Sequence, residues 1–237
     1  MRPAPTMPLH IGVVGCSAEG AALCYRTLCH DGALLFGPHA HPQVSMHTPS
    51  FAAYVDCLER DDLAGIAELM LDSARRLAAA GADFLICPDN TIHSAFALVE
   101  PRSPLPWLHI AEVVTSEASA RGYRRVGLTG TRWLVDSDVY PEKLAARGIE
   151  CVKPEPAARA EIGRIIMEEL VRDVAVPASI AYLLDVIRAL EEQGCDAVVL
   201  GCTELPLVVN DANSPLPTLD STRLLARAAL RKAAGLA

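Results

Sequence analysis

Two short polar clusters in the sequence carry residue types that can move protons. One spans residues 89–91 (D-N-T) and the other spans residues 202–204 (C-T-E). Asp89 and Cys202 offer a carboxylate and a thiol, and both groups act as acids or bases when a protein positions them. Each cluster follows a short apolar run. We therefore expect each at the C-terminal end of a buried strand, where open α/β sheets bind their ligands.

The two clusters stand at equivalent places in an internal repeat. Residues 74–91 (A-R-R-L-A-A-A-G-A-D-F-L-I-C-P-D-N-T) resemble residues 187–204 (I-R-A-L-E-E-Q-G-C-D-A-V-V-L-G-C-T-E) at a constant offset of 113 (187 − 74). At that offset Asp89 falls on Cys202. In each copy a helix is expected to end at a glycine, and a buried strand follows. The repeat predicts one cleft with a reactive side chain on each wall.

The elements that must position these clusters alternate along the chain. Apolar runs such as 11–14 and 126–128 predict strands, and helical segments separate them, which is typical of a parallel α/β fold. We expect two pseudo-symmetric parallel-sheet α/β domains with the active cleft between them. The first domain should span residues 1–110, completed by 215–237, and the second should span 111–214.

The loops that follow the first strand of each half carry further polar groups. Residues 15–20 (G-C-S-A-E-G) lead into a helix whose N–H groups could hold an anion, or Ser17 could simply cap that helix. The segment 126–132 (V-G-L-T-G-T-R) repeats this pattern. Between the two loops, the apolar run 33–36 predicts a second strand, and residues 37–49, rich in Pro, His and Gly, predict a long loop.

The composition excludes several classes of function. A net charge of −8 argues against a nucleic-acid surface. The eight cysteines lack CxxC spacing and accompanying histidines, so we expect reduced thiols in a cytoplasmic protein, with no disulfide framework and no metal site. No apolar run reaches the ~18 residues of a membrane helix. No GxGxxG motif is present, and no cofactor is expected.

Acid/base groups on opposite walls suit one type of reaction. A base removes the proton from one face of a carbon acid, an acid returns a proton to the other face, and the stereocentre is inverted. The anionic intermediate needs donors that are already in place. The strand ends supply the candidate residues for binding a small carboxylate or amino-acid substrate, which are Ser17, Asn90, Thr91, Thr131, Thr203 and Glu204.

Each proposed acid/base residue also has a structural interpretation. A helix beginning after Cys202 would lower the thiol pKa below its usual value of ~8.5, but buried cysteines are more often structural. Asp89 could serve only as the N-cap of the next helix. His93, close to the first cluster, is expected to support the site rather than to react.

The motifs resemble the aspartate/glutamate racemase family, within a wider group that includes hydantoin racemase, maleate isomerase and arylmalonate decarboxylase. The resemblance rests on residues 11–15 (I-G-V-V-G), 84–93 (F-L-I-C-P-D-N-T-I-H), 126–132 with the later Tyr140, and 197–206 (A-V-V-L-G-C-T-E-L-P). It covers nearly the whole chain, and the last motif is the most specific. The resemblance implies a cofactor-independent racemase whose acid/base pair is two cysteines between two α/β domains.

The chain departs from the family pattern at the first cysteine. Asp89 occupies that position in P-D-N-T-I-H, while Cys87, inside the apolar run, is interpreted as structural. In the opening loop Glu19 matches the family and a glycine is missing. The fold and the cleft carry over with the resemblance, but two-cysteine racemisation does not.

Three functions stay open at this point. The first is racemisation of aspartate, glutamate or a related acidic amino acid with Cys202 and Asp89 as the pair. The second is a single-cysteine decarboxylase or cis-trans isomerase of a small carboxylic acid, and the third is an inactive small-acid binding protein. The resemblance also implies a homodimer. Cationic residues would bind the substrate carboxylate, and the unranked candidates are Arg26, Arg132, Arg164 and Arg172.

Overall fold

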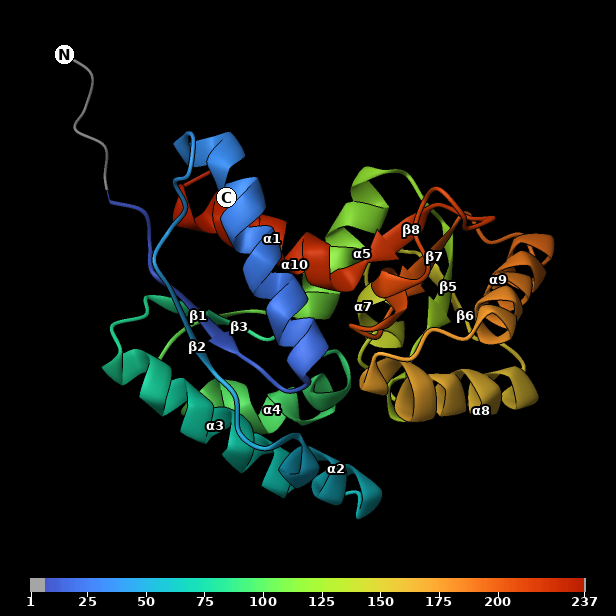
Figure 1. Ribbon diagram of the computed structural model, residues 1–237, viewed down its shortest axis with the longest axis horizontal. Helices are drawn as coiled ribbons and strands as arrows, with labels where there is room; N and C mark the ends of the chain where they lie inside the picture. The colour runs from blue at the N-terminus through green and yellow to red at the C-terminus, as the bar shows by residue number, and fades with distance from the viewer. Residues whose placement is uncertain (1–6, 237) are drawn as a thin grey trace.

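The computed structural model describes residues 7–236, which form two parallel sheets flanked by helices (Figure 1). The sheets have the same strand order, so the two halves of the chain repeat one topology and the predicted fold class is confirmed. The first sheet is ordered β2 (Val44–His47), β1 (Ile11–Val14), β3 (Phe84–Ile86), β4 (Trp107–Leu108). The second is ordered β6 (Glu150–Val152), β5 (Arg125–Thr129), β7 (Ala197–Leu200), β8 (Thr218–Asp220).

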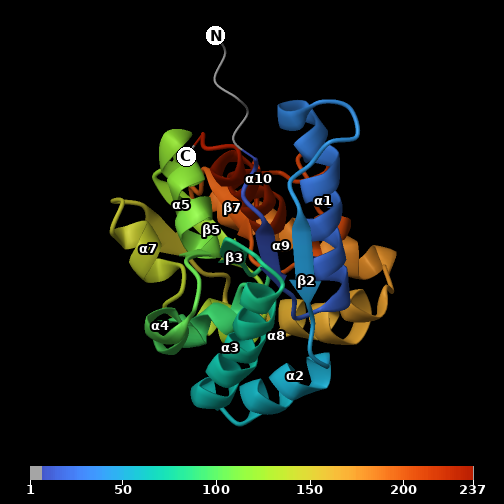
Figure 2. The same ribbon diagram turned by 90° about the vertical axis from the view of Figure 1, so that its left-hand side faces the viewer.

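Helices cover both faces of each sheet (Figures 1 and 2). On the first sheet, one face carries α1 (Ala18–Phe36) and α10 (Ser221–Ala233), and the other carries α2 (Phe51–Glu59), α3 (Leu63–Ala79) and α4 (Phe96–Val99). On the second, one face carries α5 (Ile110–Ala120), α6 (Arg132–Asp136) and α7 (Pro141–Ala145), and the other carries α8 (Pro156–Arg164) and α9 (Pro177–Glu192). Short 3-10 or π turns are η1 (Thr91–Ala95), η2 (Glu100–Arg102), η3 (Ile165–Glu169), η4 (Leu170–Arg172) and η5 (Leu205–Leu207).

The internal repeat of the sequence encodes the connection from a helix to a buried strand. Gly81 and Gly194 follow α3 and α9 with φ angles of 86° and 83°, a left-handed conformation that favours glycine. Two residues later, Asp83 accepts the backbone N–H of His10 at 2.7 Å, and Asp196 accepts that of Arg124 at 2.7 Å. Each aspartate therefore ties the start of its strand to the neighbouring strand and fixes where the following polar cluster emerges.

The C-terminal helix returns to the first half of the molecule. Leu225 and Leu230 of α10 pack in one core cluster with Ile11 and Phe84 of the first sheet. The strand before this helix, β8, pairs with β7 and belongs to the second sheet. The division into residues 1–110 with 215–237 and residues 111–214 stays a proposal, and the packing puts the crossing between halves at the junction of β8 and α10.

The prediction for residues 33–49 is wrong. Residues 33–36 form the end of α1 instead of a strand, and Leu34 is 84% exposed there. The second strand, β2, lies inside the segment 37–49 that was expected to be a loop. Its V-S-M-H sequence gives a weak apolar signal because β2 is an edge strand that is only partly buried.

Within residues 7–236, none of the helices combines the length and the apolar character needed to cross a bilayer.

Candidate active site

A small cavity of about 30 Å³ lies where the carboxyl ends of the two sheets meet, and the empty space reaches about 450 Å³ when its open mouth is counted. The residues directly after β1, β3, β5 and β7 contribute to its walls, so both halves build it. The two polar clusters of the sequence therefore lie in the lining of one cavity, at strand ends, where α/β sheets bind their ligands. The polar part of the lining consists of Cys16, Ser17, Asp89, Asn90 and Thr91 from the first half, and Thr131, Cys202, Thr203 and Glu204 from the second.

Four hydroxyl groups connect the halves across the cavity. The Ser17 and Thr203 hydroxyl oxygens lie 3.1 Å apart, and those of Thr91 and Thr131 lie 2.9 Å apart. Ser17 and Thr131 are also the N-caps of α1 and α6 in their respective halves. Each pair therefore joins one residue of the first half to one of the second, and together they form a ring of hydrogen-bonding groups around the site.

Asn90 holds the two halves together through its side chain. Its amide oxygen accepts the Tyr140 hydroxyl at 2.6 Å, and its amide nitrogen donates to the Ser221 hydroxyl at 2.9 Å. The Ser221 hydroxyl in turn donates to the backbone carbonyl of Leu200 at the end of β7. These contacts leave one side-chain N–H of Asn90 for a ligand, because an amide nitrogen carries two hydrogens.

Asp89 lines the cavity and has a raised pKa. Burial, followed by the nearby charge of Glu204, raises the pKa of Asp89 to about 6, and hydrogen bonds from the backbone of Ile92 and from the Cys16 thiol oppose that shift. The backbone N–H of Ile92 donates to Asp89 Oδ1 at 3.2 Å. Asp89 is thus both a cap of the following turn and a carboxyl group poised to titrate close to neutral pH.

Cys202 lines the cavity from the second half, against a buried carboxylate. Its thiol donates to Glu204 Oε2 at 2.7 Å, and the Thr203 hydroxyl donates to the same oxygen at 2.7 Å. Burial, followed by the charge of Glu204, raises the pKa of the thiol well above its ordinary value. The expected lowering of this pKa is wrong: a turn and the three-residue η5 follow Cys202, and a single short turn has little dipole to stabilise a thiolate.

Cys16 is a cavity residue that sequence reasoning did not select. It is buried, it directly precedes Ser17, and its thiol lowers the pKa of the Asp89 carboxyl. Burial, followed by the charge of Asp89, raises the pKa of this thiol well above its ordinary value. Each wall of the cavity therefore holds one thiol beside one carboxylate. The only sequence signal for this was the position of Cys16 directly after the loop glycine of the first strand.

Two residues expected near the site lie outside the cavity lining. Glu19 is in the first turn of α1, half-buried. His93 is buried behind the Asp89 turn, where its Nδ1 lies 2.7 Å from the backbone carbonyl of Asp89. Burial, followed by the charge of His109, lowers the pKa of His93, so Nδ1 carries the proton of a neutral ring and donates it to that carbonyl. Cys87 contacts the same carbonyl, with its sulfur 3.8 Å away.

None of the four arginines considered from the sequence lines the cavity. Arg26 and Arg172 are exposed. Arg132 stacks on the ring of Trp133, with its guanidinium carbon 4.6 Å from the ring centroid. Arg164 forms ion pairs with carboxylates of its own helical segment. Among residues 7–236 there is also no group of three or more His, Cys, Asp or Glu side chains arranged to bind a metal.

Comparison with known proteins assigns the chain to a family. The model of the family described as Asp/Glu/Hydantoin racemase matches residues 12–229. The chain belongs to this family. The racemase predicted from the motifs is confirmed at that level, and the protein is an enzyme of the racemase class.

Individual relatives agree with this family in sequence and fold. The chain is 26% identical over 161 residues to the broad specificity amino-acid racemase RacX of Bacillus subtilis (strain 168), covering 67% of this chain and 68% of the relative. A Yersinia pestis protein, named as a proposed Asp/Glu racemase, superposes with a TM-score of 0.86 at 29% identity, over 95% of this chain and 99% of that one. An aspartate racemase homologue from Pyrococcus horikoshii OT3 gives 0.81 at 26% identity, over 94% and 98%.

Proposed function

We propose that this protein racemises or epimerises an amino acid by moving a proton between the two faces of its α-carbon, with Asp89 and Cys202 as the acid/base pair. The observation that supports the proposal is that both residues line one cavity, each after an equivalent strand of its half. The family membership supports the reaction type. The resemblance makes aspartate and glutamate the first substrates to test.

The protonation states of the resting site suit this reaction. With a pKa of about 6, Asp89 is a carboxylate at neutral pH, while the raised pKa of Cys202 keeps its thiol protonated. Asp89 takes the α-proton from one face, and Cys202 donates its proton to the other face of the carbanion. The turnover leaves Asp89 protonated and Cys202 as a thiolate, which is the pair that processes the opposite enantiomer.

The groups around the cavity would stabilise the substrate and its carbanion. The Thr91 and Thr131 hydroxyls share one hydrogen bond, which leaves one of their two hydrogens free, and Asn90 keeps one free side-chain N–H. Such donors bind a carboxylate and the negative charge that spreads onto it when the α-proton leaves. The proposed step uses neither a metal nor an organic cofactor, so activity should survive treatment with a chelator.

Proton exchange in heavy water tests the proposal. A single enantiomer of an amino acid is incubated with the enzyme in D₂O, and the two enantiomers are separated at early times. Two separate bases predict deuterium in the newly formed enantiomer and hardly any in the recovered substrate. Deuterium that enters the recovered substrate first would show that one base serves both faces.

A second candidate function rests on the contact between Asp89 and the backbone of Ile92. If that cap is the only role of Asp89, Cys202 is left as a single proton donor, as in a decarboxylase or a cis-trans isomerase of a small carboxylic acid. Release of carbon dioxide from a substituted malonate, or conversion of a cis diacid, identifies those activities. An inactive small-acid binding protein shows binding without exchange in any of these assays.

We also propose, from the family resemblance, that the protein is a cytoplasmic homodimer. Sedimentation of the purified protein at several concentrations tests the dimer, and fractionation of the producing cells tests the location.

A further inference from the structure

Both halves of the molecule also contribute apolar side chains to the cavity lining. Phe51, Val55 and Leu58 reach it from α2 in the first half, and Trp133 reaches it from the start of α6 in the second. The segment after α8 adds the last side chains, Ile166, Met167 and Val171. The lining therefore combines thiols, carboxylates and hydroxyls with apolar side chains. The apolar side chains can contact the side chain of a bound substrate.

The segment that carries Ile166 and Met167 has an unusual backbone. Residues Ile165–Glu169 form a π-helical turn, in which one residue more than in an α-helix is fitted into the turn. Such turns are rare and occur frequently at functional sites, because they redirect side chains at a local energetic cost. Here the turn directs a branched and a long apolar side chain to the cavity. That placement indicates that Ile166 and Met167 contact the substrate.

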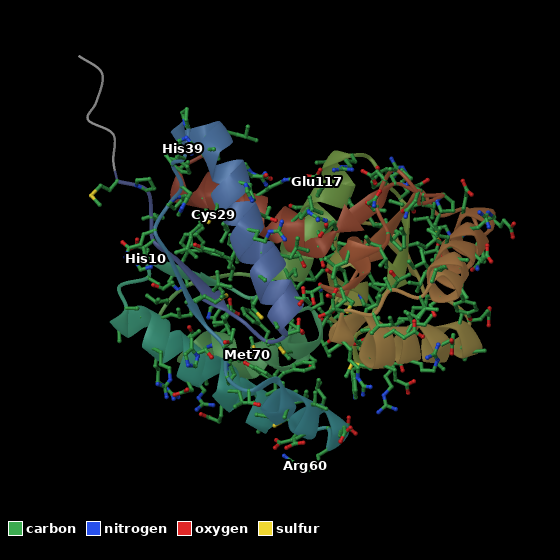
Figure 3. All side chains as sticks on the ribbon, in the orientation of Figure 1. His10, Cys29, His39, Arg60, Met70 and Glu117 are labelled. Carbon is green, nitrogen blue, oxygen red and sulfur yellow. The ribbon has the colours of Figure 1, made fainter. Side chains whose placement is uncertain are left out.

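The cavity contains negative charge and no cation. Asp89 and Glu204 are its only ionisable carboxylates, and no Lys, Arg or His of residues 7–236 is part of its lining. Arg60, the basic residue that ends α2, lies at the outer edge of that helix (Figure 3). An aspartate or glutamate substrate would place its side-chain carboxylate among apolar groups and near these two carboxylates, where it would lose hydration without gaining an ionic partner.

A zwitterionic amino acid with an apolar side chain fits all of these groups. Its α-carboxylate can accept from the free hydroxyl of the Thr91–Thr131 pair and from Asn90, and its single ammonium charge is compatible with an acidic cavity. Its side chain is removed from water by the apolar walls, which is the main source of affinity for apolar groups. Because Phe51, Val55, Trp133 and Met167 are only partly buried, covering them adds to that gain.

We propose that the substrate side chain is uncharged and apolar, in place of the acidic side chain that the family resemblance implied. This inference rests on the proposed racemisation, because it concerns the same cavity. The apolar walls select the side chain, and the polar strand ends carry out the proton transfer.

The test compares turnover with occupancy of the cavity. Both enantiomers of aspartate, glutamate, lysine, leucine, methionine and phenylalanine are assayed for α-proton exchange in D₂O. In parallel, each amino acid is tested for its ability to slow alkylation of Cys202 by iodoacetamide, followed by mass spectrometry. We expect at least about tenfold faster exchange for apolar than for acidic amino acids, a ratio typical of a hydrophobic specificity pocket, and matching protection of Cys202.

The possible outcomes separate the two proposals. Exchange that is fastest with aspartate or glutamate would overturn the apolar side chain and leave racemisation standing. The same holds for exchange that is fastest with lysine. Protection of Cys202 by apolar amino acids without any exchange would keep the side-chain preference and overturn the reaction. Neither protection nor exchange by any of the tested amino acids would overturn both.

A charge placed in the apolar wall gives an independent check. Met167→Lys introduces a cation beside the bound side chain, so it should shift the ratio of exchange rates towards aspartate and glutamate by at least about tenfold. Val174→Lys adds the same charge nearby, at an exposed position outside the cavity lining, and should leave the ratio unchanged. An unchanged ratio in the Met167 variant, with its melting temperature intact, would contradict the proposed role of this wall.

Discussion

Asp89 is the residue on which the proposed mechanism depends most. Asp89→Asn retains an oxygen that can accept the Ile92 N–H but cannot take up a proton, so exchange should fall by about 10²–10⁴, as for other positioned acid/base groups. In the wild type, kcat/KM should rise with pH as Asp89 loses its proton, with a midpoint near its pKa of about 6. Any residual activity of the variant should lack this acidic limb.

Two further variants sharpen this prediction. Asp56→Asn, on the exposed side of α2, should keep both the rate and the acidic limb. Asp89→Cys places a second thiol at the strand end and tests whether the two-cysteine chemistry implied by the family resemblance can operate in this cavity. Full wild-type exchange in Asp89→Asn would mean that the carboxylate is only a cap and that another base acts on that face.

Cys16 should act through Asp89. Its thiol donates a hydrogen bond that lowers the pKa of the carboxyl, so Cys16→Ala should raise this pKa and move the acidic limb of kcat/KM to higher pH. Cys16→Ser keeps a donor and should leave the limb near its original position. The pH profile distinguishes this role from a packing defect, since a defect alone would lower the rate at all pH values. A limb that stays in place in Cys16→Ala would rule out the proposed coupling.

At the scale of elements, the N-terminus of α1 approaches the second half without any gap. A Cβ atom built on Gly20 would lie 2.4 Å from the Thr203 methyl group, far inside normal contact. Gly20→Ala should therefore push Thr203 away from Ser17 and cost about 1–3 kcal/mol of folding free energy, as overpacking does. Exchange activity should fall as well, because the displaced residues line the cavity.

A second helical glycine provides the matched control. A Cβ on Gly163 in α8 meets nothing closer than 3.8 Å, so Gly163→Ala should be neutral or stabilising by up to about 1 kcal/mol. Urea unfolding measures both variants, and equal effects of the two substitutions would contradict the steric argument.

The element scale also shows what the sequence could and could not predict. The strands that precede Asp89 and Cys202 were predictable, because a glycine, an aspartate and an apolar run recur in both halves. The edge strand β2 was not, since a half-exposed strand lacks a continuous apolar run. The partnership of Cys16 with Asp89 and the absence of a cation from the cavity lining, within the described residues, depend on three-dimensional packing that spacing along one chain does not encode.

At the scale of the whole molecule, a chain of hydrogen bonds fastens the two halves beside the cavity. Tyr140 of the second half donates to Asn90 of the first at 2.6 Å in a buried environment. Tyr140→Phe removes this donor and leaves the Asn90 oxygen unpaired, which should lower the free energy of unfolding by about 1–3 kcal/mol. Tyr25→Phe, at an exposed position, should change it by less than about 0.5 kcal/mol. A negligible effect at Tyr140 would mean that water replaces the lost donor.

The return of α10 to the first half brings the two ends of the described chain together. The backbone N–H of Leu9 donates to the carbonyl of Ala233 at 3.0 Å, so these distant residues are direct neighbours. A circular permutant that joins Leu236 to Met7 through a short linker and opens at the exposed Gly122 should therefore fold. Every strand pair would survive in that permutant, and the order of the halves along the gene would change while the catalytic groups kept their places. Its circular dichroism spectrum and its exchange rate should match those of the parent.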